Sequence, residues 1–199
     1  TSRVQAAAGS AYAGVLPFGF EPGIHRADPA RNRTPDRQGL CTVANRDPKR
    51  DAHLEVLLAN RVPARIVGNY FARHRLFWRY PSRFRPSVPF EAMARIYARY
   101  AVSLNVHARV VRAGTNMRTF ECAGYEIPQL VEYRPGIEAL FEPGEEIAVY
   151  ERPDSVAEAA RSLLTDAPRQ ARLATRALAR ARAEHTYSHR VQQIFADLA

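Results

Sequence analysis

Residues 102–132 read VSLNVHARVVRAGTNMRTFECAGYEIPQLVE, and this stretch decides the fold class. It opens with a mostly apolar run at 102–106 that is typical of a buried strand, and it then passes through a loop that contains Gly114. A helical segment at 116–125 and a second apolar run at 129–132 follow. A strand, a helix and another strand in this order predict parallel strands joined by a right-handed crossover.

The same alternation extends on both sides of this unit. It predicts strands at 40–44, 65–67, 102–106, 129–132 and 147–150 and helices at 48–60, 91–100, 116–125, 136–141, 154–165, 168–184 and 187–198. We therefore expect an α/β fold with a doubly wound, mostly parallel sheet, followed by C-terminal helices. Residues 1–38 are weakly patterned, so we expect an interdomain segment and linker there and one domain over 39–199.

Composition sets the class of protein. The chain has 199 residues, of which 46% are hydrophobic and 25% charged, and these values exclude a disordered chain. No run approaches the ~18 apolar residues of a membrane span.

The two cysteines lie in apolar stretches and predict a reducing, cytoplasmic location. The first residue is Thr1 and no signal-peptide pattern follows, so we expect the back part of a longer protein.

The charge balance is strongly basic. The net charge is +9, and only one of the 29 basic residues is a lysine, Lys49. Arginine suits bidentate capture of phosphate, although a GC-rich genome enriches arginine in the same way. A positive net charge favours binding of an anionic partner, which can be nucleic acid, an anionic membrane surface or a phosphorylated small molecule.

Two loops at predicted strand ends are candidates for binding chemistry. In the first, Gly114 and Asn116 lead into a helix start that suits a phosphate, Arg118 adds positive charge, and Glu121 is placed to accept hydrogen bonds from a ribose diol. In the alternative interpretation both residues have structural roles, with Asn116 as the N-cap of the helix and Glu121 in an ion pair. The second loop, NRDPKR at 45–50, places three cations at another helix start, where the alternative is a capped surface helix.

Residues 70–90 interleave seven aromatic side chains with arginines. Such a pattern can stack on nucleic-acid bases, or it can anchor a long loop in a neighbouring surface, and three prolines favour irregular backbone. His185 and His189 stand four residues apart, but no third ligand is in view, which favours a structural pair over a metal site.

These motifs together resemble a known family. The strand–LN–H motif, GTNMRTFE at 114–121, FEPGEE at 141–146 and EHTYSHR at 184–190 are similar to the C-terminal domain of GT-B glycosyltransferases. Within that class, the chain most resembles the group related to spore maturation and spore-coat proteins. NRDPKR and the later GNY extend the likeness back to about residue 40.

The resemblance implies a glycosyltransferase domain, Rossmann-like in fold, that binds a nucleotide-sugar donor with no metal and no cofactor. Glu121 matches the family glutamate that binds the donor ribose. The catalytic cations on the diphosphate are implied to be Arg46, Lys49 and Arg118. The other residues implied to bind the nucleotide-sugar are Arg50, Gly68, Asn69, His107, Gly114, Thr115, Asn116 and Thr119. Ala113 departs from the pattern, because many relatives of the broader class carry a further glutamate there.

The resemblance also implies a partner, because GT-B enzymes hold the acceptor in an N-terminal domain that 38 residues are too few to form. Two alternatives remain: a non-catalytic spore-surface or assembly domain of the same fold, and a basic nucleic-acid-binding module that uses residues 70–90.

Overall fold

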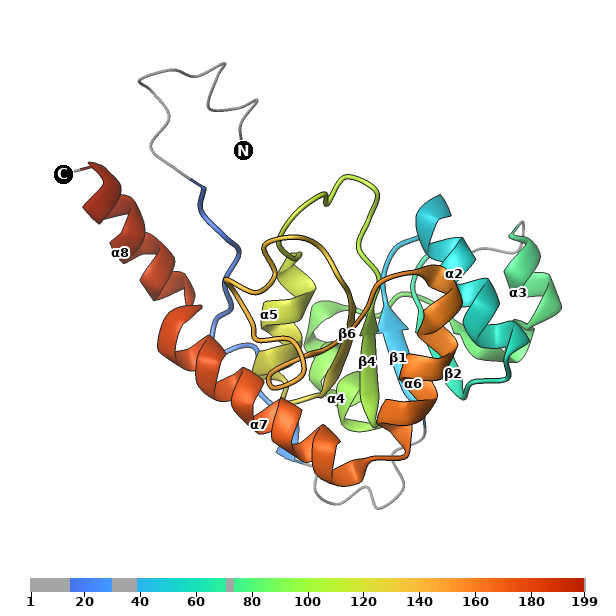
Figure 1. The fold of residues 1–199 in the computed structure, drawn as a ribbon. Coiled ribbons are helices and arrows are strands. Elements are labelled where there is room, and N and C mark those ends of the chain that lie inside the picture. The colour runs from blue at the N-terminus through green and yellow to red at the C-terminus, as the bar shows by residue number, and fades with distance from the viewer. Residues whose placement is uncertain (1–14, 30–38, 71–73, 199) are drawn as a thin grey trace.

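The structure is a computed structural model that describes residues 15–29, 39–70 and 74–198 (Figure 1). Six parallel strands form one sheet in the order β3-β2-β1-β4-β5-β6. The strands are β1 (Leu40–Val43), β2 (Ala64–Val67), β3 (Phe84–Arg85), β4 (Val102–Asn105), β5 (Gln129–Glu132) and β6 (Ala148–Tyr150). From β1 the chain adds strands on one side of the sheet, up to β3, and then returns to add β4, β5 and β6 on the other side of β1. In such folds, ligands bind in the crevice outside the carboxyl ends of the strands at this change of direction, here between β1 and β4. The doubly wound, Rossmann-like prediction is confirmed.

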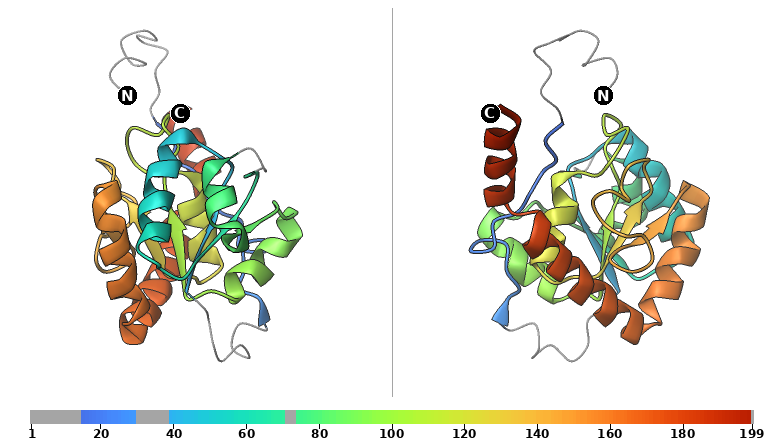
Figure 2. Two further views of the ribbon diagram at one scale, coloured as in Figure 1. Left: turned by 90° about the vertical axis from the view of Figure 1, so that its right-hand side faces the viewer. Right: turned by 60° about the vertical axis from the view of Figure 1, so that its left-hand side comes forward.

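Helices cover both faces of the sheet (Figures 1 and 2). One face carries α2 (Pro48–Ala59) and α6 (Val156–Leu164), and the other carries α4 (Met93–Ala98) and α5 (Met117–Gly124). The long helix α7 (Ala167–Glu184) contacts both α5 and α6. The described ranges also contain α3 (Arg75–Arg79), α8 (Tyr187–Leu198) and the 3-10 turns η3 (Pro81–Arg83), η4 (Phe90–Ala92) and η5 (Pro153–Ser155).

Successive residues of the strands enter different cores, as the two-residue period of a strand requires. Leu40 packs into the cluster under α2 and α6, whereas its neighbour Cys41 packs into the cluster with α4 and α5. In the same way, Leu130 and Val131 face opposite sides. Because both faces of the sheet are buried, its strands read as apolar runs, which is why the sequence revealed them.

The segment that precedes β1 packs into the domain. Phe20 is fully buried, and its N–H donates to the carbonyl of His185 at 3.0 Å, while the N–H of Tyr187 donates back to Phe20 at 3.1 Å. Phe20 thereby forms a parallel bridge at the junction of α7 and α8. The segment at 15–29 is therefore attached to the domain through Phe20, and the rest of the predicted linker lies outside the described residues.

Two parts of the chain differ from the sequence-based expectation. Residues 136–141 form successive turns instead of a short helix, starting at Gly136 with a φ of +87°. The stretch 74–90, expected to be irregular, contains α3, η3 and the two-residue strand β3. No helix in the described ranges combines the length and apolar character needed to cross a membrane.

Candidate functional site

Two adjoining cavities lie at the carboxyl ends of β1, β2 and β4. The first, of about 270 Å³, is lined by Gly68, Ser87 and Glu121 among others, and the second, of about 230 Å³, by Arg50, Asn105 and Asn116 among others. The two share the residues Val43, Ala44, Asn45, Met117 and Arg118. Because they share these walls, we treat them as one space, the strand-edge cleft. It lies at the β1–β4 reversal, where the fold predicts a ligand.

Helix α5 brings Arg118 and Glu121 to the cleft on one side of the helix, three residues apart. Arg118 Nη1 donates to Glu121 Oε2 at 2.6 Å, and the Glu121 side chain is only 4% exposed. The sequence-based reading left an ion pair and a ligand-binding pair as alternatives. The geometry shows the ion pair and also shows that both residues line the cleft.

A second carboxylate, Glu132 at the end of β5, gathers a buried polar cluster. It accepts hydrogen bonds from Lys49 Nζ at 2.7 Å, from the backbone N–H of His107 at 3.1 Å and from Arg134 Nη2 at 2.5 Å. Lys49 also donates to the carbonyl of His107 at 3.3 Å. Lys49 therefore reaches inward from α2 to the ends of β4 and β5.

His107 is fully buried beside this cluster. Its Nε2 lies 2.9 Å from Thr115 Oγ1. Burial lowers the pKa of His107 to about 4, and the nearby cations Arg134, Lys49 and Arg50 act in the same direction, outweighing Glu132. The imidazole is therefore neutral near pH 7 and serves as a hydrogen-bonding group that holds the loop.

The polar side chains of the 114–121 motif turn inward. Thr115 and Thr119 share a hydrogen bond of 2.6 Å between their hydroxyl oxygens, and Asn105 donates to Thr119 at 2.9 Å. Asn116 exchanges two hydrogen bonds with Asn105, at 2.9 and 3.0 Å. Asn116 therefore occupies the N-cap position of α5 without capping it through its side chain, so it leaves first-turn N–H groups to other acceptors. Gly114 forms the preceding turn with a φ of +65°.

At the N-terminus of α2, the carboxylate of Asp47 already takes the place that an external anion would need. Asp47 caps the helix by accepting from the N–H of Lys49 at 2.9 Å, and its second oxygen accepts from the N–H of Arg109 at 3.3 Å. An Asp carboxylate at this end satisfies both the free amides and the helix dipole. The N-terminus of α5 is therefore better placed than that of α2 to receive an external phosphate.

The three cations of the NRDPKR stretch diverge. Arg50 lines the cleft, where its guanidinium donates to the carbonyls of Val106 at 2.8 Å and Asn45 at 2.7 Å. Lys49 pairs with Glu132, as described above. Arg46 is half-exposed and lies 3.5 Å from Asp51. The structure thus brings Arg50 and Arg118 to the same cleft and places Arg46 on the surface, in the loop that precedes α2.

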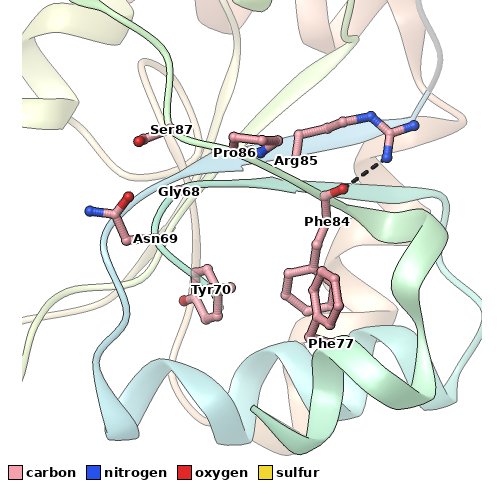
Figure 3. A pocket seen from close by; sticks show the side chains of 8 residues that line it. All are labelled: Gly68, Asn69, Tyr70, Phe77, Phe84, Arg85, Pro86 and Ser87. Atoms are coloured by element: carbon pink, nitrogen blue, oxygen red, sulfur yellow. Dashed lines mark hydrogen bonds between the residues drawn. The ribbon is translucent and has the colours of Figure 1, made fainter. Parts of the chain in front are cut away.

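Gly68 lines both the strand-edge cleft and a third cavity of about 250 Å³, and Asn69 lines the third cavity (Figure 3). A Cβ at Gly68 would lie 1.9 Å from the carbonyl oxygen of Ala44, so the close approach of β2 to the end of β1 requires glycine. The Asn69 amide donates to Asn45 Oδ1 at 3.3 Å. This hydrogen bond fixes Asn69 beside the first cavity.

The third cavity is aromatic. Phe84 lies 5.4 Å from Tyr70 and 5.9 Å from Phe77, measured between ring centroids, and all three rings line the cavity (Figure 3). Burial raises the pKa of Tyr70 to about 12. These aromatics of the 70–90 stretch anchor the loop, whereas Trp78 remains 67% exposed. Phe71 and Arg73 lie outside the described residues.

Sequence reasoning missed Asn105, Glu132 and Arg134. A signal was present for two of them, because Asn105 and Glu132 are polar residues at the carboxyl ends of their strands, where the ligands of a parallel sheet bind. Across the described ranges, no three His, Cys, Asp or Glu side chains are grouped as metal ligands would be. His185 contacts the carbonyl of Leu140 at 2.7 Å and His189 contacts Thr186 at 2.7 Å, so each ring has a structural partner.

Solved structures share this fold. HepE from Anabaena, in complex with UDP and glucose, superposes with a TM-score of 0.71 at 16% identity, over 90% of this chain and 55% of that protein. Sucrose-phosphate synthase from Thermosynechococcus elongatus gives 0.70 at 15% identity, over 99% of this chain and 56% of that one. The chain thus spans about half the length of these proteins.

A separately solved domain is similar in size to this chain. The C-terminal domain of a group 1 glycosyl transferase, LpcC from Francisella tularensis, gives a TM-score of 0.62 at 10% identity, over 84% of this chain and 99% of that domain. None of the curated proteins matches the sequence. The family model described as glycosyl transferase-like matches residues 49–196, well over half of the chain. The chain therefore belongs to the glycosyl transferase-like family.

Proposed function

We propose that this chain is the donor-binding domain of a glycosyltransferase and that the strand-edge cleft holds a nucleoside-diphosphate sugar. The observation that carries the proposal is the Arg118–Glu121 pair, which places a carboxylate and a guanidinium side by side on the wall of the cleft. The family match and the UDP-bound state of the similar HepE structure support it. Within this class, the sequence motifs favour the spore-maturation-like group.

The cleft offers partners to the ribose and to the diphosphate of such a donor. A carboxylate accepts hydrogen bonds from both hydroxyls of a ribose, and Glu121 has lone pairs left beside its contact with Arg118. Arg118 and Arg50 supply two fixed positive charges for the diphosphate. Uncapped amides at the start of α5 add donors that suit a phosphate oxygen.

The chemistry we assign to these groups is stabilisation of the leaving group. As the bond between the sugar and the diphosphate breaks, negative charge grows on the phosphate oxygens. Donors held in place beforehand stabilise that charge, typically by a few kcal/mol for each donor. Lys49 is directed to Glu132 and to the carbonyl of His107 instead, so the two arginines of the cleft are the side chains assigned to this role. The proposal assigns this stabilisation to side chains and amides and includes no metal or cofactor.

The acceptor, in this proposal, binds to an N-terminal domain that the longer protein supplies. Helix α8 extends away from the body of the domain, alongside the segment at 15–20 (Figures 1 and 2). It exposes apolar side chains at helical spacing, namely Tyr187, Val191, Ile194 and Phe195. Val15, Leu16 and Phe18 are also exposed. An apolar surface of this kind fits the attachment of a second domain.

Calorimetric titration with UDP, GDP and ADP tests the proposal. We expect at least one of them to bind and expect Glu121→Gln and Arg118→Gln each to weaken binding by roughly tenfold, the effect of one charge-assisted hydrogen bond. Arg176→Gln is the matched control, because that arginine pairs with Glu145 on the exposed side of α7. Absence of binding at millimolar nucleotide, or unchanged binding in both cleft variants, would overturn the proposal.

A further inference from the structure

The carboxylate of Glu121 has a second neighbour, which comes from the segment preceding β1. His25 Nε2 lies 3.7 Å from Glu121 Oε1, while Arg118 holds Oε2 on the other side. The side chains of His25 and Glu121 are 8% and 4% exposed. At this burial, the interaction of a ring N–H dipole with a carboxylate is weakly screened by solvent.

The hydrogen bonds of His25 assign its ring proton. The backbone N–H of Glu21, which can only donate, points at His25 Nδ1 at 3.0 Å. His25 Nδ1 also lies 3.2 Å from the carbonyl of Glu21, but that contact is longer, and the carbonyl already accepts from the N–H groups of Ile24 at 3.0 Å and His25 at 2.8 Å. Nδ1 is therefore the acceptor, and the ring hydrogen is on Nε2, facing Glu121.

The ring is fixed by its surroundings. It meets Tyr125 and Phe90 edge to face, with centroid distances of 5.7 and 5.4 Å. Gly124 allows the segment this close to α5, because a Cβ there would lie 2.5 Å from the carbonyl oxygen of His25 and 2.7 Å from Phe20. The segment is also held at its other end, where Arg190 Nε donates to the carbonyl of Phe18 at 3.0 Å.

We infer that His25 is a positioning residue for the donor ribose, acting through Glu121. Arg118 and His25 flank the carboxylate, so its plane is set before a ligand arrives, and less conformational entropy is lost when the ribose hydroxyls bind. The inference rests on the proposed function, since it assumes that Glu121 contacts the ribose. It gives the segment that precedes β1 an indirect part in donor binding, through Glu121.

Two variants of His25 separate positioning from packing. His25→Phe keeps a ring against Tyr125 and Phe90 and removes the Nε2 hydrogen, whereas His25→Gln restores an N–H near the same place. The probes are the tightest binder among UDP, GDP and ADP and its 2′,3′-dideoxy counterpart, each titrated by calorimetry. We expect His25→Phe to weaken binding of the ribonucleotide by roughly threefold to tenfold and to change binding of the dideoxynucleotide by less than about twofold. His25→Gln should largely restore binding of the ribonucleotide.

A double-variant cycle gives an independent readout. If His25 acts through Glu121, His25→Phe adds no further loss in a Glu121→Gln background. Equal losses for both nucleotides, or additive losses in the cycle, would refute the inference while leaving the donor-binding proposal intact. Circular dichroism checks that each variant is folded, and His25→Leu replaces His25→Phe if that one is not. No binding of any nucleotide by the unaltered chain defeats the proposed function itself.

Discussion

Lys49 and Glu132 form an ion pair with an N–O distance of 2.7 Å that joins the first turn of α2 to the end of β5. Glu132 is buried, and it also accepts from Arg134 and from the backbone of His107. One buried carboxylate therefore compensates two cations that are each 22% exposed and also accepts from a buried amide. Removing one partner of such a cluster costs far more than the net contribution of the pair, because the remaining charges stay buried.

We therefore predict that Glu132→Gln lowers the free energy of unfolding by about 3 kcal/mol, measured by urea denaturation. Glu145→Gln is the control. Glu145 pairs with Arg176 at a half-exposed site, so its loss should cost less than about 1 kcal/mol. Similar small losses in both variants would show that the Glu132 cluster is solvated and contributes little to stability.

The lowered pKa of His107 predicts how stability depends on pH. The ordinary pKa of 6.5 applies in the unfolded chain, and burial lowers it to about 4 in the folded protein. Between these values the unfolded state binds the additional proton, so stability falls as pH decreases from 6.5 to 4 and is fully present above 6.5. His53 and His185, whose pKa values burial also lowers, act in the same direction.

His107→Gln removes the largest part of this dependence. Thermal or urea unfolding between pH 4 and 7 should show a shallower rise for the variant, with a difference on the order of 3 kcal/mol between the two ends of the range. Parallel curves for the two proteins would mean that His107 is protonated in the folded state at pH 5, contrary to its burial.

Gly124 controls the contact between α5 and the segment at 20–25. Gly124→Ala places a Cβ against the backbone of His25 and the ring of Phe20, so the segment must shift. We expect a loss of about 1–3 kcal/mol in urea unfolding, typical of overpacking, together with faster tryptic cleavage after Arg26. Gly23→Ala in the same segment is the control, because its Cβ would approach only a glutamate side-chain oxygen at 3.5 Å. Equal behaviour of the two variants would contradict this.

Periodicity and capping predicted most of the fold. Asp47 and Pro48 marked the start of α2, and the apolar runs marked every strand except β3, which has two residues and lies between Pro81 and Pro86. The site was predicted less completely. Spacing placed Arg118 and Glu121 on one helix, but it did not reveal that Lys49 turns inward to Glu132. That contact depends on how far α2 lies from the end of β5 in the folded chain.

The contact of His25 with Glu121 is a second one that residue spacing could not reveal. His25 lies 96 positions before Glu121 in the sequence, within a stretch whose weak pattern predicted only a connecting segment. Its position follows from a backbone turn at Glu21 and from the missing Cβ of Gly124, and neither has a periodic signal. Tertiary contacts between polar side chains of distant segments are therefore the part of this site that pattern reasoning could not supply.

The exposed face of α8 provides the last prediction. Phe195 is 70% exposed and shares its face with Val191 and Ile194. Because these side chains bury little area in this chain, Phe195→Glu should change the free energy of unfolding by less than about 0.5 kcal/mol. If a preceding domain covers this face in the longer protein, the same substitution should destabilise that protein and weaken association of a separately expressed preceding domain. A large loss of stability in the 199-residue chain alone would mean that α8 already packs through Phe195.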